Sequence, residues 1–442
     1  MAVHHHILLR PLSAPLRHTH LSFSLPPLLP PPARVRSSLP APACRLATHA
    51  DAIEEPEFVP PEVEEAAEED KGDAQFVVVT FYKFVPLDDP RAEVASHLQF
   101  LQGRDIHGRI YMNEQGINAQ YSGPHKDAMA YADWLRKDYR FRGMLVQTSP
   151  ALNGHAFPRL KLRYKPSLVQ LEGGSSHLPL VDPGMRATPL TPLEWRERLE
   201  AWKCIDLSSN KASGDTFGRK LLLLDVRNDY EWDIGHFQGA QRPNVDCFRS
   251  TSFGLSEEVE DPSDPLNGVD KEKTDILMYC TGGIRCDVYS TILRKKGFCN
   301  LYTLVGGVSN YLKMEGAAGW VGNLFVFDGR LSLPPATFGS PAEADADDNR
   351  WVGRCYSCGS EVVELRHRNC ANIDCNRLYL SCGWCAEELG GCCCSECKAA
   401  PRLRPLLPGH QRYRKWHAYR DGFVIDAEED DDTDQQPPLL AR

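Results

Sequence analysis

The order of hydrophobic and polar positions between Phe76 and Thr148 predicts a small α+β domain. Phe76 to Tyr82 is a β-branched and aromatic run, which is typical of a buried strand. After it come a helical segment, two strands around a turn, a second helical segment and a final strand, over Arg91 to Leu101, Gly108 to Met112, Gly116 to Tyr121, Lys126 to Asp138 and Met144 to Thr148. This β-α-β-β-α-β order predicts a ferredoxin-like sandwich, which we assign to residues 74–172.

A second pattern, short apolar strands that alternate with helical segments, extends over residues 190–332. The strands are Leu221 to Asp225, Ile276 to Tyr279 and Leu301 to Leu304. Such alternation predicts a parallel α/β sheet, whose ligand sites lie beyond the carboxyl ends of the strands. Cys280 directly follows the second strand, so we expect it at this edge. The acidic, Pro-bearing stretch from Leu255 to Lys273 lacks periodicity and is predicted to be a mobile surface insertion.

Cys280 opens a loop of small residues that ends at Arg285, with Thr281, Gly282, Gly283 and Ile284 between them. In a strand-loop-helix arrangement of this kind, backbone N–H groups turn inward and bind an anion, and the positive end of the helix adds to the effect. Together with the charge of Arg285, these groups favour a thiolate or a persulfide. We therefore interpret Cys280 and Arg285 as catalytic residues; a buried structural cysteine, the alternative, needs neither the paired glycines nor the arginine. Cys286 is a candidate resolving thiol, although packing explains it equally well.

Further residues around this loop stand in a characteristic order. They are Asp225-Val226-Arg227, Glu231, Gly235-His236, Gly239-Ala240 and Gly306-Gly307. With the six-residue loop, this order resembles a rhodanese domain. The resemblance implies that the loop accommodates sulfur, because the loop of the related phosphatases is one residue longer. We interpret Asp225, Arg227, Glu231 and His236 as structural residues that shape the loop.

Ten of the sixteen cysteines lie between Cys355 and Cys397, a distribution that favours reduced thiols and a metal module over a disulfide scaffold. Cysteine pairs separated by two residues place both thiolates on one turn, and two such turns complete a tetrahedral zinc site. We predict a zinc module over residues 350–400 with two structural ions; an iron–sulfur cluster and disulfides are the alternatives. One ion is assigned to Cys355, Cys358, Cys382 and Cys385, and the other to Cys370, Cys375, Cys397 and one of Cys392 to Cys394, for which we choose Cys394.

Residues 401–442 form a basic and then an acidic tail. Arg412, Arg414, Lys415 and Trp416 combine cations with an aromatic ring, which is how single-stranded RNA loops are held, so we regard them as RNA-binding candidates. The alternative is a solvated basic segment that pairs with the acidic run Glu428 to Asp434.

The start of the chain differs in composition from the rest. Residues 1–50 contain five arginines and no Asp or Glu, which is typical of an organelle transit peptide. We expect a chloroplast protein of the stroma, with the mitochondrion as the alternative. Residues 51–73 are acidic and poor in apolar side chains, so they are predicted to be a disordered linker. The formal net charge is −10, so a polyanionic partner must be held by a local basic patch, and no apolar run is long enough to span a membrane.

Five short pieces of the chain also stand in a specific order. They are Thr80 to Lys83, Gly108 to Tyr111, Gly116 to Gln120, Tyr279 to Cys286 and Phe325 to Asp328. With the Cys-rich end, they resemble the tRNA uridine hydroxylase family, and specifically its plant chloroplast rhodanese-like members. The resemblance implies an oxidoreductase that converts a wobble uridine to 5-hydroxyuridine, with tRNA as partner and molecular oxygen as co-substrate. Gln115 and Gly329 stand where the family has glutamate, and these departures concern the substrate more than the fold.

Two other functions stay open. A rhodanese-type sulfurtransferase carries a persulfide on Cys280 and takes its sulfur from a small-molecule donor. A non-catalytic binding module uses the same domain as an interaction surface, which the intact thiol loop disfavours. Gly116 to Gln120 and the zinc module favour RNA modification, because a simple sulfur carrier needs neither. The sequence contains no flavin or nicotinamide motif and no evident set of two histidines and one carboxylate for iron, so oxygen use comes from the resemblance alone.

Overall fold

The computed structural model describes residues 75–152, 154–171, 173–208, 219–242, 248, 264–339 and 353–406. Several predictions fall on other parts of the chain. The transit peptide, the acidic linker, residues 255–263 of the insertion, and the RNA-binding candidates Arg412, Arg414, Lys415 and Trp416 lie outside the described residues. None of the helices in the described ranges combines the length and apolar content needed to cross a membrane.

The N-terminal domain is the predicted ferredoxin-like sandwich with one additional strand. Its elements are β1 (Phe76–Phe84), α1 (Pro90–Leu101), β2 (His107–Asn113), β3 (Gly116–Pro124), α2 (His125–Arg136), the 3-10 helix η1 (Tyr139–Phe141), β4 (Gln147–Pro150) and β5 (Leu160–Tyr164). The sheet order is β4-β1-β3-β2-β5, and β5 joins the edge parallel to β2. The prediction missed β5, because Leu160-Lys161-Leu162-Arg163-Tyr164 is short and carries two cations.

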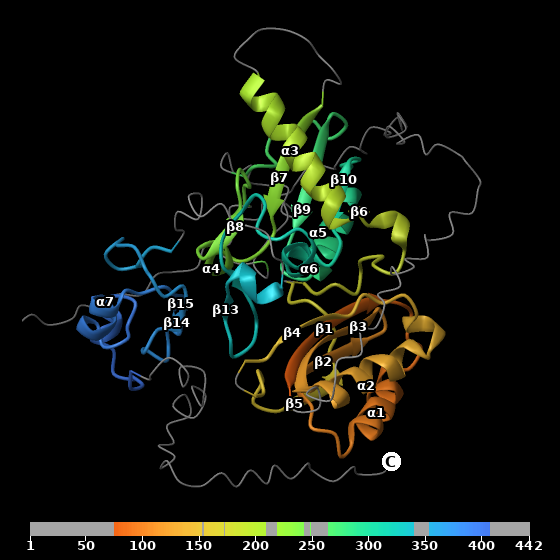
Figure 1. Ribbon diagram of the computed structural model, residues 1–442, viewed down its shortest axis with the longest axis horizontal. Helices are drawn as coiled ribbons and strands as arrows, with labels where there is room; N and C mark the ends of the chain where they lie inside the picture. Colours follow the sequence, from red (N-terminus) through yellow and green to blue (C-terminus); the bar gives the residue numbers. More distant parts are fainter. Residues whose placement is uncertain are drawn as a thin grey trace, which may run out of the picture. The chain divides into compact units, whose positions relative to one another are not determined.

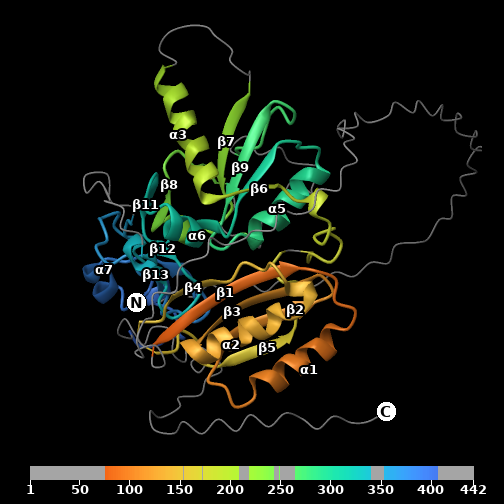
Figure 2. The same cartoon turned by 45° about the vertical axis from the view of Figure 1, so that its right-hand side comes forward.

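The two faces of this sheet have opposite character. Side chains alternate along a strand, so one face holds Val79, Phe81, Ile110, Met112, Ile117 and Ala119, all buried. Helices α1 and α2 cover this apolar face (Figures 1 and 2). The opposite face holds the half-buried polar residues Thr80, Tyr82, Arg109, Tyr111, Asn118 and Gln120. We call this second surface the polar face of the sheet.

The central domain contains the predicted parallel sheet. Its elements are η2 (Pro183–Met185), β6 (Thr188–Leu190), α3 (Pro192–Ser208), β7 (Lys220–Asp225), α4 (Asp229–Trp232), β8 (Gly235–Phe237), β9 (Thr274–Tyr279), α5 (Ile284–Lys295), β10 (Leu301–Leu304) and α6 (Gly307–Met314). The strand order is β6-β10-β9-β7, and all neighbours are parallel. Both faces of the sheet are buried, which explains why its strands are continuous apolar runs without alternation.

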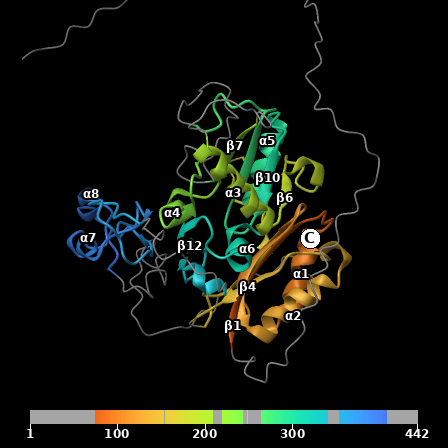
Figure 3. The same ribbon diagram turned by 45° about the horizontal axis from the view of Figure 1, so that its top comes forward.

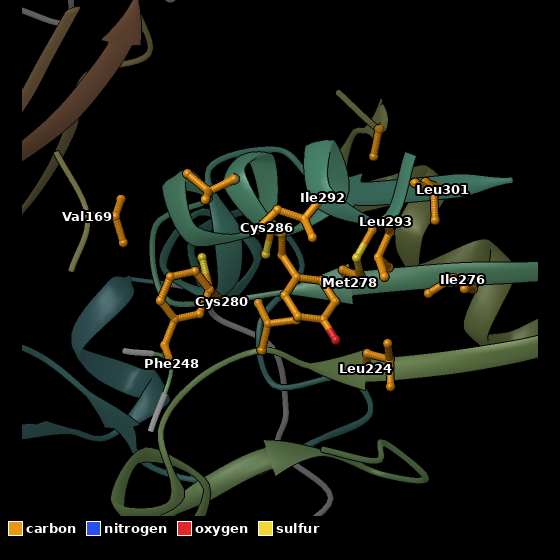
Figure 4. Close-up of a cluster of buried hydrophobic side chains, with 14 of the residues drawn as sticks. Val169, Leu224, Phe248, Ile276, Met278, Cys280, Cys286, Ile292, Leu293 and Leu301 are labelled. Atoms are coloured by element: carbon orange, nitrogen blue, oxygen red, sulfur yellow. The ribbon is translucent and has the colours of Figure 1, made fainter. Parts of the chain in front are cut away.

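One face of the central sheet packs against α5. Leu224 and Met278 of the sheet share one buried cluster with Ile292 and Leu293 of the helix, and this cluster extends to Cys280 at the end of β9 (Figure 4). Cys299, a few residues after α5, is disulfide-bonded, whereas the distribution of cysteines favoured reduced thiols over a disulfide scaffold. Spacing along the chain does not show which distant thiols folding brings together.

The C-terminal part of the described chain is built from short elements. They are β11 (Trp320–Gly322), β12 (Leu324–Phe325), β13 (Ser332–Leu333), η4 (Pro335–Phe338), β14 (Arg368–Asn369), β15 (Leu378–Tyr379), α7 (Gly383–Glu388) and α8 (Ser395–Lys398). Figure 3 labels α7 and α8 in this Cys-rich module. Half of its buried hydrophobic residues are cysteines, so few large apolar side chains stabilise it. A small domain of this kind depends on metal ligands for its stability.

Candidate active site at the thiol loop

The thiol loop lies where the sequence predicts it, at the carboxyl edge of the parallel sheet. β9 ends at Tyr279, Cys280 follows, and α5 begins at Ile284. Gly283 has a φ of 101°, and a Cβ there would lie 2.9 Å from the Tyr82 hydroxyl. A Cβ on Gly307 would lie 2.4 Å from the carbonyl oxygen of Cys280. The tight loop therefore requires glycine at these two positions, whereas a Cβ on Gly282 would meet nothing within 4 Å.

The environment of Cys280 favours a thiolate. Burial alone would raise its pKa, but the Cys286 thiol, the charge of Arg285 and the backbone N–H groups of Cys286 and Gly283 together lower the pKa to about 6. The Gly283 N–H donates to the Cys280 Sγ at 3.1 Å. A pKa of about 6 means that Cys280 is mainly ionised at neutral pH, although its side chain is fully buried.

Cys286 is the hydrogen-bond donor in this pair of thiols. It lies in the first turn of α5 and is fully buried (Figure 4). Burial and the hydrogen bond with Cys280 both raise its pKa well above the usual range. Cys286 therefore keeps its proton at neutral pH and donates it toward the Cys280 thiolate. The structure brings the candidate resolving thiol within hydrogen-bonding contact of the Cys280 thiol.

Arg285 does not point its guanidinium at the sulfur. It forms a two-point ion pair with Glu231, at 2.5 Å and 2.8 Å, and also donates to the Thr281 hydroxyl at 3.1 Å. Thr281 in turn donates to Glu231 at 2.9 Å. Burial raises the pKa of Glu231, but Arg285 outweighs it, so the carboxylate is ionised. These contacts fix the conformation of the loop, and Arg285 acts on Cys280 through its charge.

The other residues that resemble a rhodanese domain surround this ion pair. Arg227 pairs with Asp225 at 2.6 Å and donates to the Gly235 carbonyl oxygen at 2.6 Å. His236 stacks on Trp232 with ring centroids 3.9 Å apart. Burial lowers the pKa of His236, which keeps its ring neutral. All of these side chains hold the segment from β7 to β8.

The N-terminal domain contributes a side chain that the sequence did not single out for this site. Tyr82, on the polar face of the sheet, donates to Asp287 Oδ2 at 3.0 Å, and Arg186 lies 3.3 Å from the same oxygen. Burial raises the pKa of Tyr82 well above its usual range, so the hydroxyl stays protonated. Tyr82 also packs against the cluster that contains Cys280. The thiol loop is thus enclosed by residues of two domains.

The Cys-rich module contains two groups of four thiols. In each group, the four sulfur atoms lie within 4.8 Å of one another. The first group consists of Cys355, Cys358, Cys382 and Cys385, and the second of Cys370, Cys375, Cys393 and Cys397. Four thiols at this separation fit a structural zinc ion, which prefers tetrahedral thiolate ligands. The first group agrees with the predicted pairing. In the second, Cys393 replaces the predicted Cys394.

The position of Cys394 explains this error. Cys394 is the N-cap of α8, and its sulfur accepts the Cys397 N–H at 3.5 Å. Cys393 Sγ lies 3.8 Å from Cys375 Sγ and 3.7 Å from Cys397 Sγ. Adjacent residues in extended backbone point in opposite directions, so only one of two neighbouring cysteines can face the group. Spacing alone does not show which of them does.

The first thiol group packs against the domain that carries the thiol loop. Cys355 and Cys385 share a buried cluster with Ile234 and Phe325. Tyr230, the neighbour of Glu231, contacts Phe325 and the fully buried His367 with ring centroids 5.1 Å and 6.1 Å apart. Burial lowers the pKa of His367 to about 3, so this ring is neutral. A metal ion held by the first thiol group would therefore stabilise a surface that packs against α4.

A third group of metal-ligating side chains consists of Asp105, His107 and His155. His155 Nε2 lies 2.8 Å from Asp105 Oδ1, and the two imidazole rings stack with centroids 3.6 Å apart. The sequence did not show this set of two histidines and one carboxylate, because His155 comes from a distant loop. His107 lies four residues from Tyr111 along β2, about 13 Å at the usual rise of a strand. We assign this group no step at Cys280.

The parallel sheet and the thiol loop define a rhodanese-like protein with domains added on both sides. Family models match accordingly: a UPF0176 acylphosphatase like domain at residues 76–168, a rhodanese-like domain at 207–314 and a rhodanase C-terminal region at 321–398. The chain is 62% identical over 369 residues to the rhodanese-like domain-containing protein 8, chloroplastic, of Arabidopsis thaliana. This alignment covers 80% of this chain and 81% of that protein.

Bacterial relatives narrow the family further. The chain is 39% identical over 346 residues to the tRNA uridine(34) hydroxylase of Protochlamydia amoebophila, with 78% of this chain and 95% of that protein covered. It is 36% identical over 344 residues to the tRNA uridine(34) hydroxylase of Chlamydia felis, with 77% and 94% covered. The chain therefore belongs to the tRNA uridine(34) hydroxylase family.

The hydrogen bond from Cys286 is tested by the pH dependence of Cys280 alkylation. In the wild-type protein we expect the rate, followed by mass spectrometry of the Cys280 peptide, to rise with pH through a midpoint near 6. A hydrogen bond to a charged group contributes about 1.5–3 kcal/mol, so Cys286→Ala should raise the midpoint by about 1–2 pH units. Cys286→Ser keeps a donor and should retain the wild-type midpoint. Equal midpoints in the Ala and Ser variants would contradict this role.

The thiol groups are tested by the metal content of purified variants. We expect about two equivalents of zinc in the wild-type protein, one in Cys358→Ser and one in Cys393→Ser, because three thiolates hold zinc poorly at a structural site. Cys394→Ser is the matched control, and it should retain two equivalents, since serine is a good N-cap. Loss of zinc in Cys394→Ser with full content in Cys393→Ser would refute the second group.

Proposed function

We propose that this protein hydroxylates the wobble uridine of tRNA to 5-hydroxyuridine, with molecular oxygen as co-substrate and Cys280 as the reactive group. The observation that carries the proposal is an ionised thiol in an anion-holding loop, in a chain whose relatives named tRNA uridine(34) hydroxylase align over nearly their whole length. The reaction replaces C5–H by C5–OH with one oxygen atom. The other atom leaves as water, so a two-electron donor must also take part.

The residues of the site have separate roles in this proposal. The Cys280 thiolate is the reactive sulfur, and the N–H of Gly283 and the thiol of Cys286 stabilise its charge. Arg285 and Glu231 hold the loop in the conformation that presents these donors. Two structural zinc ions, one in each thiol group, hold the Cys-rich module together.

We place the protein in the chloroplast, with the stroma as its compartment. The support is the basic, acid-free composition of residues 1–50 and the word chloroplastic in the name of the Arabidopsis relative. The substrate is then an organellar tRNA.

A persulfide sulfurtransferase is the second candidate. The observation in its favour is the same loop, because backbone N–H groups around Cys280 stabilise a persulfide anion as well as a thiolate. Cys286, in contact with Cys280, can attack the persulfide sulfur attached to Cys280 and release hydrosulfide as a disulfide forms. This function needs no RNA, so the two candidates differ in their substrate.

The test is nucleoside mass spectrometry of organellar tRNA from plant cells that lack the gene. Loss of 5-hydroxyuridine in these cells, and its return with the wild-type gene, are the expected results. Cys280→Ser should not restore it, because it removes the thiolate, whereas Cys394→Ser, a matched thiol substitution outside both metal groups, should. Unchanged 5-hydroxyuridine in the deletion would refute the proposal, and thiocyanate formation from thiosulfate and cyanide by the purified protein would then support the sulfurtransferase.

A further inference from the structure

The outer strand β5 carries a row of basic residues along one edge of the N-terminal sheet. Lys161 and Arg163 are exposed, whereas Leu162 between them points into the core. In the register of the sheet they lie beside Arg109 and Tyr111 of β2. Lys165 follows the strand, and its N–H bonds to the Met112 carbonyl oxygen, which fixes its backbone. We call Lys161, Arg163 and Lys165 the basic edge.

Carboxylates do not neutralise the basic edge. Among the ion pairs of the described residues, none includes Lys161, Arg163 or Lys165. Partial desolvation by the surrounding protein, followed by the charges of the neighbouring arginines, lowers the pKa values of Lys161 and Lys165. Asp328, which interacts electrostatically with the neighbouring Arg109, is already paired with Arg330 at 2.6 Å. Like charges held together in this way repel one another, and a polyanion would relieve the repulsion.

Aromatic rings adjoin these cations on the polar face. Lys165 Nζ lies 4.6 Å from the centroid of the Tyr111 ring, and Arg163 Cζ lies 5.7 Å from it. Tyr111 faces Asn118 of β3, which faces Tyr82 of β1. Tyr82 is two strand spacings from Tyr111, about 10 Å, and it touches the thiol loop. On the polar face, Tyr111 and Tyr82 therefore lie between the basic edge and the thiol loop, and both also pack against the buried cluster that contains Cys280.

We propose that the polar face and the basic edge form the surface on which the RNA substrate binds. This inference rests on the proposed function and names the site that presents the uridine to the thiol. Lys161, Arg163 and Lys165 contact backbone phosphates, Tyr111 stacks with an unpaired base, and the target uridine reaches the loop beside Tyr82. Cations interleaved with aromatic rings suit a single-stranded RNA loop, whose phosphates and unpaired bases contact both kinds of side chain. An acidic peptide would contact the cations but has no bases to stack on the rings. In a chain of net charge −10, the patch supplies the local positive potential that a polyanion requires.

The test compares two double charge reversals in the full-length protein. Lys161→Glu with Arg163→Glu alters the basic edge, and Lys137→Glu with Arg142→Glu alters exposed cations beyond α2 by the same total charge. Binding to a fluorescent anticodon stem-loop is measured by anisotropy at several salt concentrations. Loss of two phosphate contacts should weaken binding at least about tenfold and lower the slope of log K against log salt by about 1.4–1.8. The control pair should stay within about twofold of the wild type.

Two further measurements separate the possible failures. Thermal unfolding and the midpoint of Cys280 alkylation, taken on both double variants, show whether the fold and the thiol loop are intact. Normal RNA binding by the intact basic-edge variant, or an equal loss in the control, overturns the binding surface. If wild-type protein forms 5-hydroxyuridine in that case, the proposed function stands without this surface. If the basic-edge variant alone loses RNA binding while wild-type protein forms no 5-hydroxyuridine, the surface stands and the proposed reaction falls.

Discussion

The buried ion pair between Glu231 and Arg285 is the constraint on which the site depends. The Glu231 side chain is fully buried and that of Arg285 is 9% exposed, so neither charge is solvated well enough to exist alone. Removal of one partner from such a pair costs about 3–5 kcal/mol, because the other charge is left buried without compensation. Both members of the pair also form hydrogen bonds with the hydroxyl of Thr281, the residue next to Cys280. The ion pair and these hydrogen bonds thus fix the conformation of the loop around Cys280.

All three parts of the described chain meet around this pair. Tyr230, beside Glu231, packs against Phe325 and His367, which connects the loop to the Cys-rich module. Asp287, two residues after Arg285, accepts a hydrogen bond from Tyr82, which connects it to the N-terminal sheet. A sulfur carrier needs only the loop itself. The flanking parts add a Cys-rich module on one side and a polar sheet face on the other, which the proposed RNA substrate would explain.

The parts of this site that are continuous in sequence could be predicted, and the parts that depend on long-range contacts could not. The loop from Cys280 to Arg285 and the first thiol group follow from short spacings with a direct physical meaning. Tyr82 and Asp287 are 205 residues apart, and no local pattern relates them. The requirement for glycine at position 307 has the same origin, because it depends on the approach of Cys280.

The errors also have physical causes. Three consecutive cysteines offer the same chemistry, and only the backbone direction places Cys393 in the second thiol group and Cys394 at a helix cap. β5 was not predicted because its two exposed cations make the sequence resemble that of a loop. An edge strand with one exposed face tolerates such cations. The same cations form the basic edge, so the charges that obscured the strand in the sequence also suggest that the strand binds RNA.

The most direct test of the account is where the target nucleotide lies when tRNA is bound. A tRNA with 4-thiouridine in place of the wobble uridine can be cross-linked to the wild-type protein by ultraviolet light, and the attached peptides identified by mass spectrometry. We predict attachment to the peptides that contain Cys280 and Tyr82. Attachment confined to the Cys-rich module or to the helices on the opposite face of the N-terminal sheet would contradict it.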